Sequence, residues 1–528
     1  MDKISIFDST LRDGAQAEGI SFSVEDKLKI VKALDEFGVD WIEAGNPGSN
    51  PKDLEFFRRA GEMDLRTAKL VAFGSTRRRG IDVMDDNNVQ SLLAAKTEAV
   101  AIFGKSWDFH VTEIINTTLE ENLAMIADTI AFFKREGKQV IFDAEHFFDG
   151  YVANPAYAVQ TLKAAADAGA DWLVLCDTNG GAFPGDVAAV TQAMREMFAV
   201  PIGIHCHNDC GMAAANTVMS VEAGARMVQG TFTGFGERCG NAALCTVIPV
   251  LQVKHGLACV PEENMPLLAH TARLVAEVAN MSLPENAPFV GRAAFAHKGG
   301  MHIDGVAKAS QSFEHINPES VGNERRVLTS EVAGRSTILR RIQKVKPDIQ
   351  KDSPETKQII DALKDLEHQG YQFEAAESTF DLVIRKHLGK YKPFFELVNF
   401  KIIGEQPYDK GRSASAVIKV LVDGKEEITA AEGDGPVNAL DKALRKALEV
   451  FYPQLASVHL TDYKVRVLDG GEATAAKVRV LIESSDGETS WSNVGVSNDI
   501  IEASWVALVD SIEYKLIRDL ERKYSAYL

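Results

Sequence analysis

The chain has 528 residues, of which 45% are apolar and 25% are charged, a composition typical of a folded globular protein and not of a disordered one. Its formal net charge of −18 argues against nucleic acid or an anionic membrane as the main partner. A site for an anionic substrate must therefore take its positive charge from a metal ion, an arginine or a helix N-terminus.

Targeting signals are not evident in the sequence. The first residues, MDKISIFDST, lack the basic and apolar regions of a leader peptide, and no stretch has the length of a membrane span. The six cysteines contain no C-x-x-C pair and are few for a chain of this length. They are typical of reduced thiols, so we expect a cytoplasmic protein.

Short apolar runs recur through the first half of the chain, about thirty residues apart, as in a barrel of repeated β/α units. They are Ile4–Phe7, Trp41–Ala44, Leu70–Phe73, Val100–Phe103, Val140–Phe142, Trp172–Cys176, Ile202–His207 and Met227–Thr231. Helical patterns lie between most of them, for example a helix expected to start after the N-cap Asn154 and to end at Gly169. The order predicts an α/β fold with a (β/α)8 TIM barrel over residues 1–270. An open doubly wound sheet is the alternative, but no G-x-G-x-x-G follows the first run.

The pattern changes beyond the barrel. Residues 287–305, APFVGRAAFAHKGGMHIDG, fit neither period and predict an ordered loop, within a helical linker or subdomain over residues 271–380 that completes the active site. Residues 381–528 then repeat a pattern of hairpin, further strand and helix. We expect this α+β ββ(β)α repeat to be a regulatory and dimerisation domain, because it holds no cluster of catalytic residue types.

Two histidines mark the seventh run, in GIHCHNDCG. Side chains alternate along a strand, so His205 and His207 share one direction and Cys206 takes the other, which excludes a zinc knuckle. At the C-terminal end of a barrel strand, that shared direction is the mouth where barrel enzymes carry their active sites. The remaining alternatives are a pair of metal ligands and two structural core histidines.

Neighbouring strand ends offer further ligands. Asp13 follows the first run and Asn241 follows the eighth, and the first, seventh and eighth strands of a closed barrel are consecutive. The set suits an open catalytic site for Zn²⁺, Mn²⁺ or Mg²⁺. Taken singly, Asp13 is better explained as a helix cap and Asn241 as a turn residue than as ligands. Arg12 can stabilise an oxyanion there, with Glu43 expected as its bidentate partner, although an ordinary Arg–Glu ion pair is an alternative.

Four motifs together resemble one enzyme family. They are DSTLRDGAQ at residues 8–16, IHCHNDCGMAAANT at 204–217, GERCGN at 236–241 and HKGGMHIDG at 297–305. They resemble the acyl-CoA Claisen-condensing branch of the metal-dependent lyase barrels, which holds 2-isopropylmalate, homocitrate and citramalate synthases, with hydroxymethylglutaryl-CoA lyase more distant. The C-terminal repeat is similar to the allosteric domain of this family, so the resemblance covers nearly the whole chain.

The resemblance implies roles for individual residues. Asp13, His205 and His207 would bind a divalent metal, with Asn241 as an additional or indirect ligand. Arg12 would stabilise the oxyanion, and Thr178 would bind the carboxylate of the 2-oxo acid. His302 would deprotonate the methyl group of acetyl-CoA, the co-substrate, and Glu145 would assist it. Many relatives carry tyrosine where this chain has Phe313, so a hydroxyl group is not expected to take part at that position.

The identity of the 2-oxo acid depends on the fifth strand. FDAEHFFDGY, at residues 142–151, replaces the S-P-E-D or S-C-E-D sequences that resemble the isopropylmalate and homocitrate branches, and looks like a citramalate-forming branch. Phe73, Phe103 and Phe142 are expected either to wall a small pocket for the methyl group of pyruvate or to be barrel core. We expect pyruvate, on the route to isoleucine. The alternatives are 2-oxoisovalerate, on the route to leucine, and an aldolase or lyase of the same superfamily. The expected assembly is a homodimer with isoleucine at the C-terminal domain.

Overall fold

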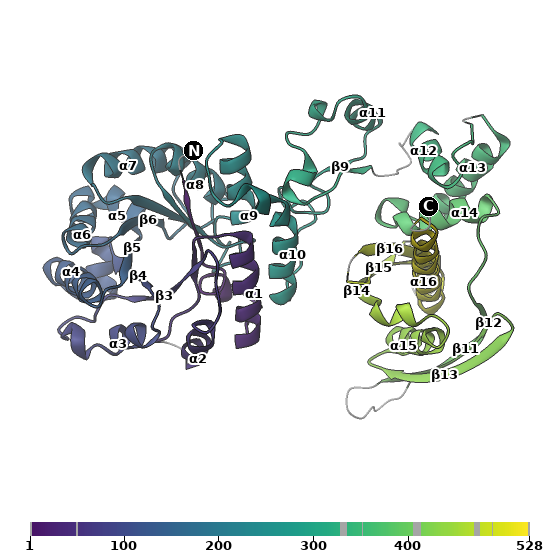
Figure 1. Ribbon diagram of the computed structural model, residues 1–528, viewed down its shortest axis with the longest axis horizontal. Coiled ribbons are helices and arrows are strands. Elements are labelled where there is room, and N and C mark those ends of the chain that lie inside the picture. Colours follow the sequence, from purple (N-terminus) through teal and green to yellow (C-terminus); the bar gives the residue numbers. More distant parts are fainter. Residues whose placement is uncertain are drawn as a thin grey trace. The chain divides into compact units, whose positions relative to one another are not determined.

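The computed structural model describes residues 3–48, 51–327, 335–350, 352–404, 413–468, 476–487 and 489–525 (Figure 1). By its internal contacts the chain divides into two units, Met1–Ala296 with Ala309–Arg326, and His297–Lys308 with Val327–Leu528. This division does not test the boundaries expected at residues 270 and 380, which stay predictions.

The first unit is built on a closed barrel of eight parallel strands, in the order β1 to β8, with β8 returning to β1. The strands are β1 Ser5–Asp8, β2 Trp41–Glu43, β3 Lys69–Ser75, β4 Ala99–Lys105, β5 Gln139–Glu145, β6 Trp172–Asp177, β7 Ile202–Cys206 and β8 Met227–Gly230. Each of the eight expected runs coincides with one of them. The predicted TIM barrel is confirmed, and the open doubly wound sheet is excluded.

Helices surround this barrel (Figure 1). They are α1 Val24–Phe37, α2 Pro51–Ala60, α3 Asn87–Ala94, α4 Leu119–Arg135, α5 Phe147–Ala153, α6 Pro155–Asp167, α7 Pro184–Met197, α8 Ala213–Glu222, α9 Leu244–Pro249 and α10 Leu268–Val278. Helix α6 begins as predicted: the side chain of Asn154 accepts a hydrogen bond from the backbone N–H of Tyr157, and Pro155 follows it. Local sequence therefore determines this helix start directly.

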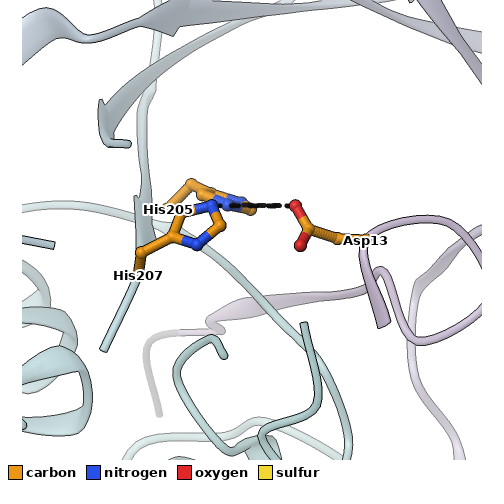
Figure 2. Close-up of side chains that lie close together, drawn as sticks. All are labelled: Asp13, His205 and His207. Carbon is orange, nitrogen blue, oxygen red and sulfur yellow. Dashed lines mark ion pairs between the residues drawn. The ribbon is translucent and has the colours of Figure 1, made fainter. Parts of the chain in front are cut away.

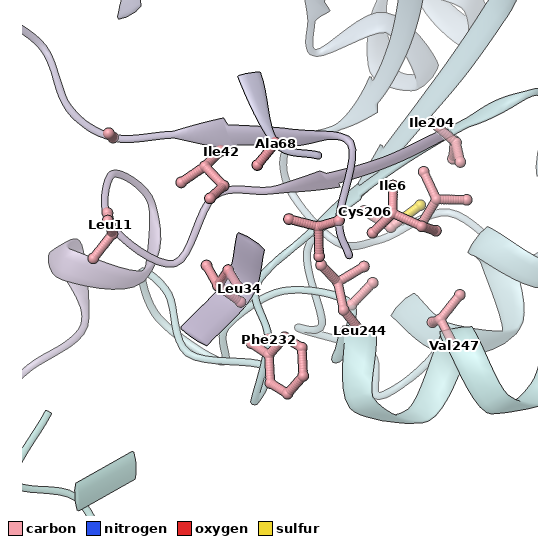
Figure 3. Packing of buried hydrophobic residues seen from close by; sticks show 14 of the residues in the cluster. Ile6, Leu11, Leu34, Ile42, Ala68, Ile204, Cys206, Phe232, Leu244 and Val247 are labelled. Atoms are coloured by element: carbon pink, nitrogen blue, oxygen red, sulfur yellow. The ribbon is translucent and has the colours of Figure 1, made fainter. Parts of the chain in front are cut away.

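Each barrel strand contacts two apolar cores, one on either face. The lumen of the barrel is filled by buried residues of alternate positions, among them Phe7, Val71, Ile141 and Val174. The larger core lies between the strands and the helices. Figure 3 shows Cys206 in this outer core, among Ile6, Ile204 and Leu244. The prediction that Cys206 points away from the barrel mouth is confirmed.

The second unit begins with helices. They are α11 Gly300–Lys308, α12 Arg335–Val345, α13 Pro354–Gln369 and α14 Glu377–His387, and two short strands, β9 Ala296–His297 and β10 Arg326–Val327, lie where the chain passes between the units. The loop expected over residues 287–305 is wrong in its last part, because α11 starts at Gly300. The two glycines before Met301 hid this helix from a sequence-based prediction, since glycine is a poor helix former.

Two copies of one motif form the rest of this unit. The first contains β11 Glu396–Gly404, β12 Ala414–Val422, β13 Lys425–Gly433 and α15 Pro436–Glu449; the second contains β14 His459–Val467, β15 Val478–Ser485, β16 Ser490–Ser497 and α16 Ile500–Ser525. Each is a three-stranded antiparallel sheet followed by a helix. Their apolar faces share one core, which includes Ile418, Leu444, Ile482 and Leu508. The predicted ββ(β)α repeat is confirmed.

In the part of the chain that the structure describes, no helix is both long and apolar enough to cross a membrane. All six cysteines are free thiols.

Candidate active site and metal centre

Three side chains converge at the C-terminal end of the barrel (Figure 2). His205 is the second-last residue of β7 and His207 directly follows the strand, while Asp13 lies in the turn after β1. The Nε2 atoms of both imidazoles lie 3.8 Å from Oδ2 of Asp13. One possible ligand atom from each residue lies within 4.8 Å of the other two, and all three side chains are buried. Among the described residues, this is the one cluster of three or more such ligands.

The structural alternatives for Asp13 and Asn241 can now be judged. Asp13 occupies the N-cap position of the short helical turn Gly14–Gln16, but its side chain makes no capping hydrogen bond. Asn241 donates from Nδ2 to Oδ1 of Asp13 at 2.8 Å. A Cβ atom at Gly236 would lie 2.1 Å from this Nδ2, so the glycine of GERCGN is needed for the close approach. The structure therefore places both side chains in contact with each other beside the histidine pair.

The cluster has the properties of a divalent metal site. Oδ1 of Asn241 and Nδ1 of His207 are buried without a hydrogen-bond partner, which is unfavourable unless another group occupies the site. Burial, followed by the nearby His207, lowers the pKa of His205 to about 3, so its imidazole is neutral, as a metal ligand must be. Burial opposes the ionisation of Asp13, but Arg12 and the histidines outweigh it and hold its pKa below the usual range. Two neutral imidazoles with carboxylate and amide oxygens suit a divalent metal ion.

Arg12 contacts two carboxylates. Its Nε donates to Oε2 of Glu43 at 2.6 Å, and its Nη1 donates to Oδ2 of Asp13 at 2.8 Å. The expected bidentate pair with Glu43 is therefore wrong: Glu43 accepts from Nε through Oε2 alone, and Nη1 donates to Asp13. Glu43 also accepts a hydrogen bond from the hydroxyl of Ser9, and the guanidinium lies 3.8 Å from the ring centroid of Phe73. These contacts fix the guanidinium beside the metal cluster.

A cavity of about 230 Å³ opens over the cluster. It is lined by Arg12, Asp13, Gln16, Phe73, Phe103, Asp143, Glu145, Cys176, Thr178, His205, His207, Glu237 and Arg238. Nearly all of these residues follow or end barrel strands. The structure thus brings together the predicted residues of strands 1, 5, 6 and 7 around one space of the size expected for a small substrate.

Aromatic rings form one wall of this cavity. Phe73 and Phe103 stack with their ring centroids 5.2 Å apart. Phe142, in contrast, is fully buried in the outer core between strands and helices. Of the two alternatives for Phe142, the place in the core is the one that the structure supports, because Phe142 lies on the opposite face of β5 from the inward-facing Ile141.

Glu145 and Thr178 are both held by neighbours. Glu145 forms an ion pair with Lys105 of the adjacent strand β4. The hydroxyl of Thr178 accepts a hydrogen bond from the backbone N–H of His146 at 2.9 Å. His146 adopts a left-handed conformation, with φ of 56°, that a non-glycine residue rarely takes. The hydrogen of the Thr178 hydroxyl therefore stays available to a ligand, and the strained turn after β5 sets its direction.

Sequence reasoning missed two residues that line the cavity, Arg238 and Asp143, and the buried Gln229 between Asp143 and His205. Arg238 of GERCGN donates to the carbonyl of Thr178 at 2.7 Å and pairs with Asp209. Gln229 on β8 contacts His205, and Asp143 on β5 accepts a hydrogen bond from Gln229. Asp143 lies two residues after the inward-facing Ile141, so alternation along the strand would have placed it on the same face. Gln229 is the residue of β8 that pairs with His205 of β7. Burial and the charge of Glu43 raise the pKa of Asp143 to about 8.

His302 is the one predicted site residue outside the first unit. It lies on α11 with an exposed side chain, and its ring centroid is 6.5 Å from that of His297. Its role as a base stays a prediction.

Three family descriptions match consecutive parts of the chain. Residues 3–275, more than half of the chain, match the HMGL-like family. Residues 289–371 match the homocitrate synthase post-HMGL domain-like family, and residues 374–516 match the LeuA allosteric (dimerisation) domain.

Relatives that match nearly the whole chain identify the group within this family to which it belongs. An (R)-citramalate synthase from Aquifex aeolicus is 52% identical over 98% of this chain and 99% of its own length. One from Synechocystis is 51% identical over 97% of this chain and 96% of its own length. The chain belongs to the citramalate synthase group of the HMGL-like family. It is accordingly an enzyme of the acyltransferase type that joins an acyl group to a substrate by condensation. A probable 2-isopropylmalate synthase from Methanopyrus kandleri is 32% identical over 97% of this chain and 98% of its own length.

Proposed function

We propose that this enzyme condenses acetyl-CoA with pyruvate and water to form citramalate and CoA, as a step towards isoleucine. The observation that carries the proposal is similarity over nearly the whole chain to five proteins named (R)-citramalate synthase, at 44–52% identity. The intact cluster of Asp13, His205 and His207 supports the proposal. A chain that had lost this reaction would have no need to keep three metal ligands together.

In this proposal, Asp13, His205 and His207 hold a divalent metal ion, which is Mn²⁺, Mg²⁺ or Zn²⁺, and Asn241 adds an amide oxygen. When bound, such an ion polarises the keto group of a 2-oxo acid and orients it through its oxygens. Arg12 stabilises the alkoxide that develops on the former keto oxygen, and Glu43 holds Arg12 in place. Thr178 donates its hydroxyl hydrogen to the carboxylate of the 2-oxo acid.

The carbon–carbon bond needs a base. We assign this role to His302, assisted by Glu145: the base removes one proton from the acetyl methyl group, and the resulting enolate carbon attacks C2 of pyruvate. The alkoxide takes a proton to give citramalyl-CoA. Water then cleaves this thioester, releasing citramalate and the thiol of CoA. Hydrolysis of the thioester makes the overall reaction effectively irreversible.

The stacked pair of Phe73 and Phe103 supports pyruvate as the 2-oxo acid. Two aromatic rings in contact leave little room beside the guanidinium of Arg12, which lies over Phe73. A methyl group needs less space there than the isopropyl group of 2-oxoisovalerate.

One assay tests the substrate. Thiol release from acetyl-CoA is measured in parallel with pyruvate, 2-oxobutyrate, 2-oxoisovalerate and 2-oxoglutarate. We expect the highest kcat/KM with pyruvate. Higher kcat/KM with 2-oxoisovalerate would instead assign the enzyme to leucine synthesis, and release of acetyl-CoA from citramalyl-CoA without net condensation would favour a lyase.

For the second unit, we propose a homodimer that binds isoleucine as a feedback inhibitor, in the cytoplasm, where free thiols are stable. The match of residues 374–516 to an allosteric (dimerisation) domain supports it. Isoleucine, leucine and valine are compared as inhibitors of the full chain and of a chain ending at residue 389. Isoleucine should inhibit the full chain most strongly, and the shortened chain should keep some condensation without inhibition. Equal inhibition of both chains rules the proposal out.

A further inference from the structure

A buried amide joins His205 to the opposite side of the barrel lumen. Gln229 lies next to His205, since β7 and β8 pair these two residues in register. Oε1 of Gln229 lies 3.0 Å from Nδ1 of His205, and Nε2 of Gln229 donates to Oδ1 of Asp143 on β5 at 2.9 Å. Gln229 is fully buried, and Asp143 and His205 are almost so.

We propose that Asp143 and Gln229 are positioning residues that fix the tautomer of His205 for metal binding. Nε2 of Gln229 donates to Oδ1 of Asp143, an oxygen that can accept in the ionised carboxylate and, as the carbonyl oxygen, in the protonated acid, so the amide oxygen faces the imidazole. That oxygen can only accept, so Nδ1 of His205 carries the hydrogen. The lone pair then lies on Nε2, the nitrogen 3.8 Å from the carboxylate of Asp13.

The opposite orientation of the amide would have the reverse effect. The NH2 group of Gln229 would face Nδ1 and place the lone pair there, and Nε2 of His205 would carry a hydrogen into the metal cluster. A protonated Nε2 cannot bind a metal ion. Because Gln229 is fully buried between Asp143 and His205, its contact with Asp143 decides which nitrogen of His205 is available.

Burial alone does not explain this arrangement. An amide that only filled space in the lumen would cost free energy, since apolar groups of that volume fill the layer below it, at Val174 and Met227. The chain instead contains two polar side chains from separate strands that satisfy each other and one metal ligand. Loss of a side chain that holds a metal ligand in this way typically weakens metal affinity about 10–100-fold.

The inference rests on the metal site of the proposed function, and the test separates the two. Binding of Mn²⁺ to the metal-stripped full chain is measured by isothermal titration calorimetry for the wild type and four variants. Gln229→Met keeps the volume but removes the acceptor for Nδ1, and we expect its Kd to rise about 10–100-fold. Asp143→Asn lets the amide turn either way, so a smaller rise is expected.

The double variant Asp143→Asn with Gln229→Glu is the decisive one. A glutamate at 229 can only accept from Nδ1 of His205, and an asparagine at 143 supplies the donor that the glutamate needs, so Kd should return close to the wild-type value. Thr191→Val is the matched control: it removes the contact of 3.2 Å to Ser220, a buried side-chain contact outside the lumen, and should leave Kd unchanged.

The outcomes are distinct. If the wild type binds no Mn²⁺, the metal site itself fails and the inference fails with it. If the wild type binds Mn²⁺ and Gln229→Met binds it equally well, only the inference is overturned. A double variant as weak as Gln229→Met, or a Thr191→Val variant weakened to the same extent, also overturns it, because loss of barrel packing would then explain the result. The melting temperature of each metal-free variant is recorded to compare their folding.

Discussion

Arg12 and Glu43 are joined by a hydrogen bond of 2.6 Å between Nε and Oε2, in a part of the barrel mouth from which solvent is almost excluded. The same guanidinium donates to Asp13 from Nη1. Burial acts to lower the pKa of Arg12, but the carboxylates of Glu43 and Asp13 outweigh it and raise this pKa. The positive charge at the cavity is therefore permanent and fixed in direction.

Arg12→Lys should distinguish the effect of the positive charge at residue 12 from the effect of its hydrogen-bond directions. A lysine keeps the positive charge but replaces the planar guanidinium, which donates from Nε to Glu43 and from Nη1 to Asp13, with one nitrogen that cannot reproduce both directions. We expect kcat to fall by about 10²–10³-fold, as when one oxyanion donor is lost, while the Kd for Mn²⁺ changes far less. Steady-state kinetics and metal titration check the two effects. Arg238→Lys, at the cavity rim, is the control and should lower kcat less; equal losses would argue against a special role for Arg12.

Phe103→Ala should change the choice of 2-oxo acid. Removing one ring of the stacked pair enlarges the cavity beside Phe73, where the alkyl group of the substrate is proposed to lie. The ratio of kcat/KM for 2-oxoisovalerate to that for pyruvate should rise by about 10–200-fold. Parallel thiol-release assays with the two acids measure it.

Phe142→Ala is the matched control for this variant. Phe142 packs in the outer core, so its loss should lower the free energy of unfolding by about 3–5 kcal/mol and leave the substrate ratio unchanged. If both variants shift the ratio equally, loosening of the barrel and not the shape of the pocket sets the specificity.

The barrel and the metal ligands were predictable because simple periodicities encode them. Apolar runs at a regular interval gave the strands, and alternation along β7 placed His205 and His207 on one side and Cys206 on the other. The cap at Asn154 depends on contacts within a few residues, so the start of α6 was also predictable. These features require no knowledge of distant contacts.

The predictions that were wrong, left open or missed concern residues whose place depends on which face of a strand they occupy or on contacts with other side chains. For Phe142 the pocket and the barrel core both stayed open, although the alternation that located His205 would have turned it outward. The bidentate contact of Arg12 and Glu43 was wrong: Nη1 of Arg12 donates to its chain neighbour Asp13. Asp143 and Gln229 lie 86 positions apart, and only closure of the barrel brings them into contact. No local pattern contains that pair.

Glu513→Gln should alter how stability depends on pH. Burial raises the pKa of Glu513 to about 7, although the backbone N–H of Phe394 and the charge of Lys386 oppose the shift and Asp510 adds to it. Between its unfolded pKa of about 4.3 and pH 7, the unfolded chain is ionised here and the folded chain is protonated. The contribution of Glu513 to the free energy of unfolding is therefore fully present below about pH 4. It decreases as the pH rises to 7, by at most about 1.4 kcal/mol per pH unit.

Glutamine removes this titration and keeps an oxygen for the N–H of Phe394. We expect the melting temperature of the second unit in Glu513→Gln to be close to that of the wild type at pH 5 and higher than it at pH 8. Scanning calorimetry at the two pH values checks the sign. A variant that is destabilised more at pH 8 than at pH 5 would show that the folded wild type favours the ionised carboxylate.

His302→Ala should affect turnover far more than binding of the 2-oxo acid. The residues proposed to bind that acid, Arg12 and Thr178, belong to the barrel, whereas the proposed base lies on α11. Loss of a general base lowers rates by about 10²–10⁴-fold, so kcat should fall within this range while KM for pyruvate changes little. Met301→Ala, at an exposed neighbour on the same helix, is the control and should keep kcat. Near-normal turnover in His302→Ala, or an equal loss in Met301→Ala, would remove His302 from the chemistry and leave Glu145 as the remaining candidate for the base.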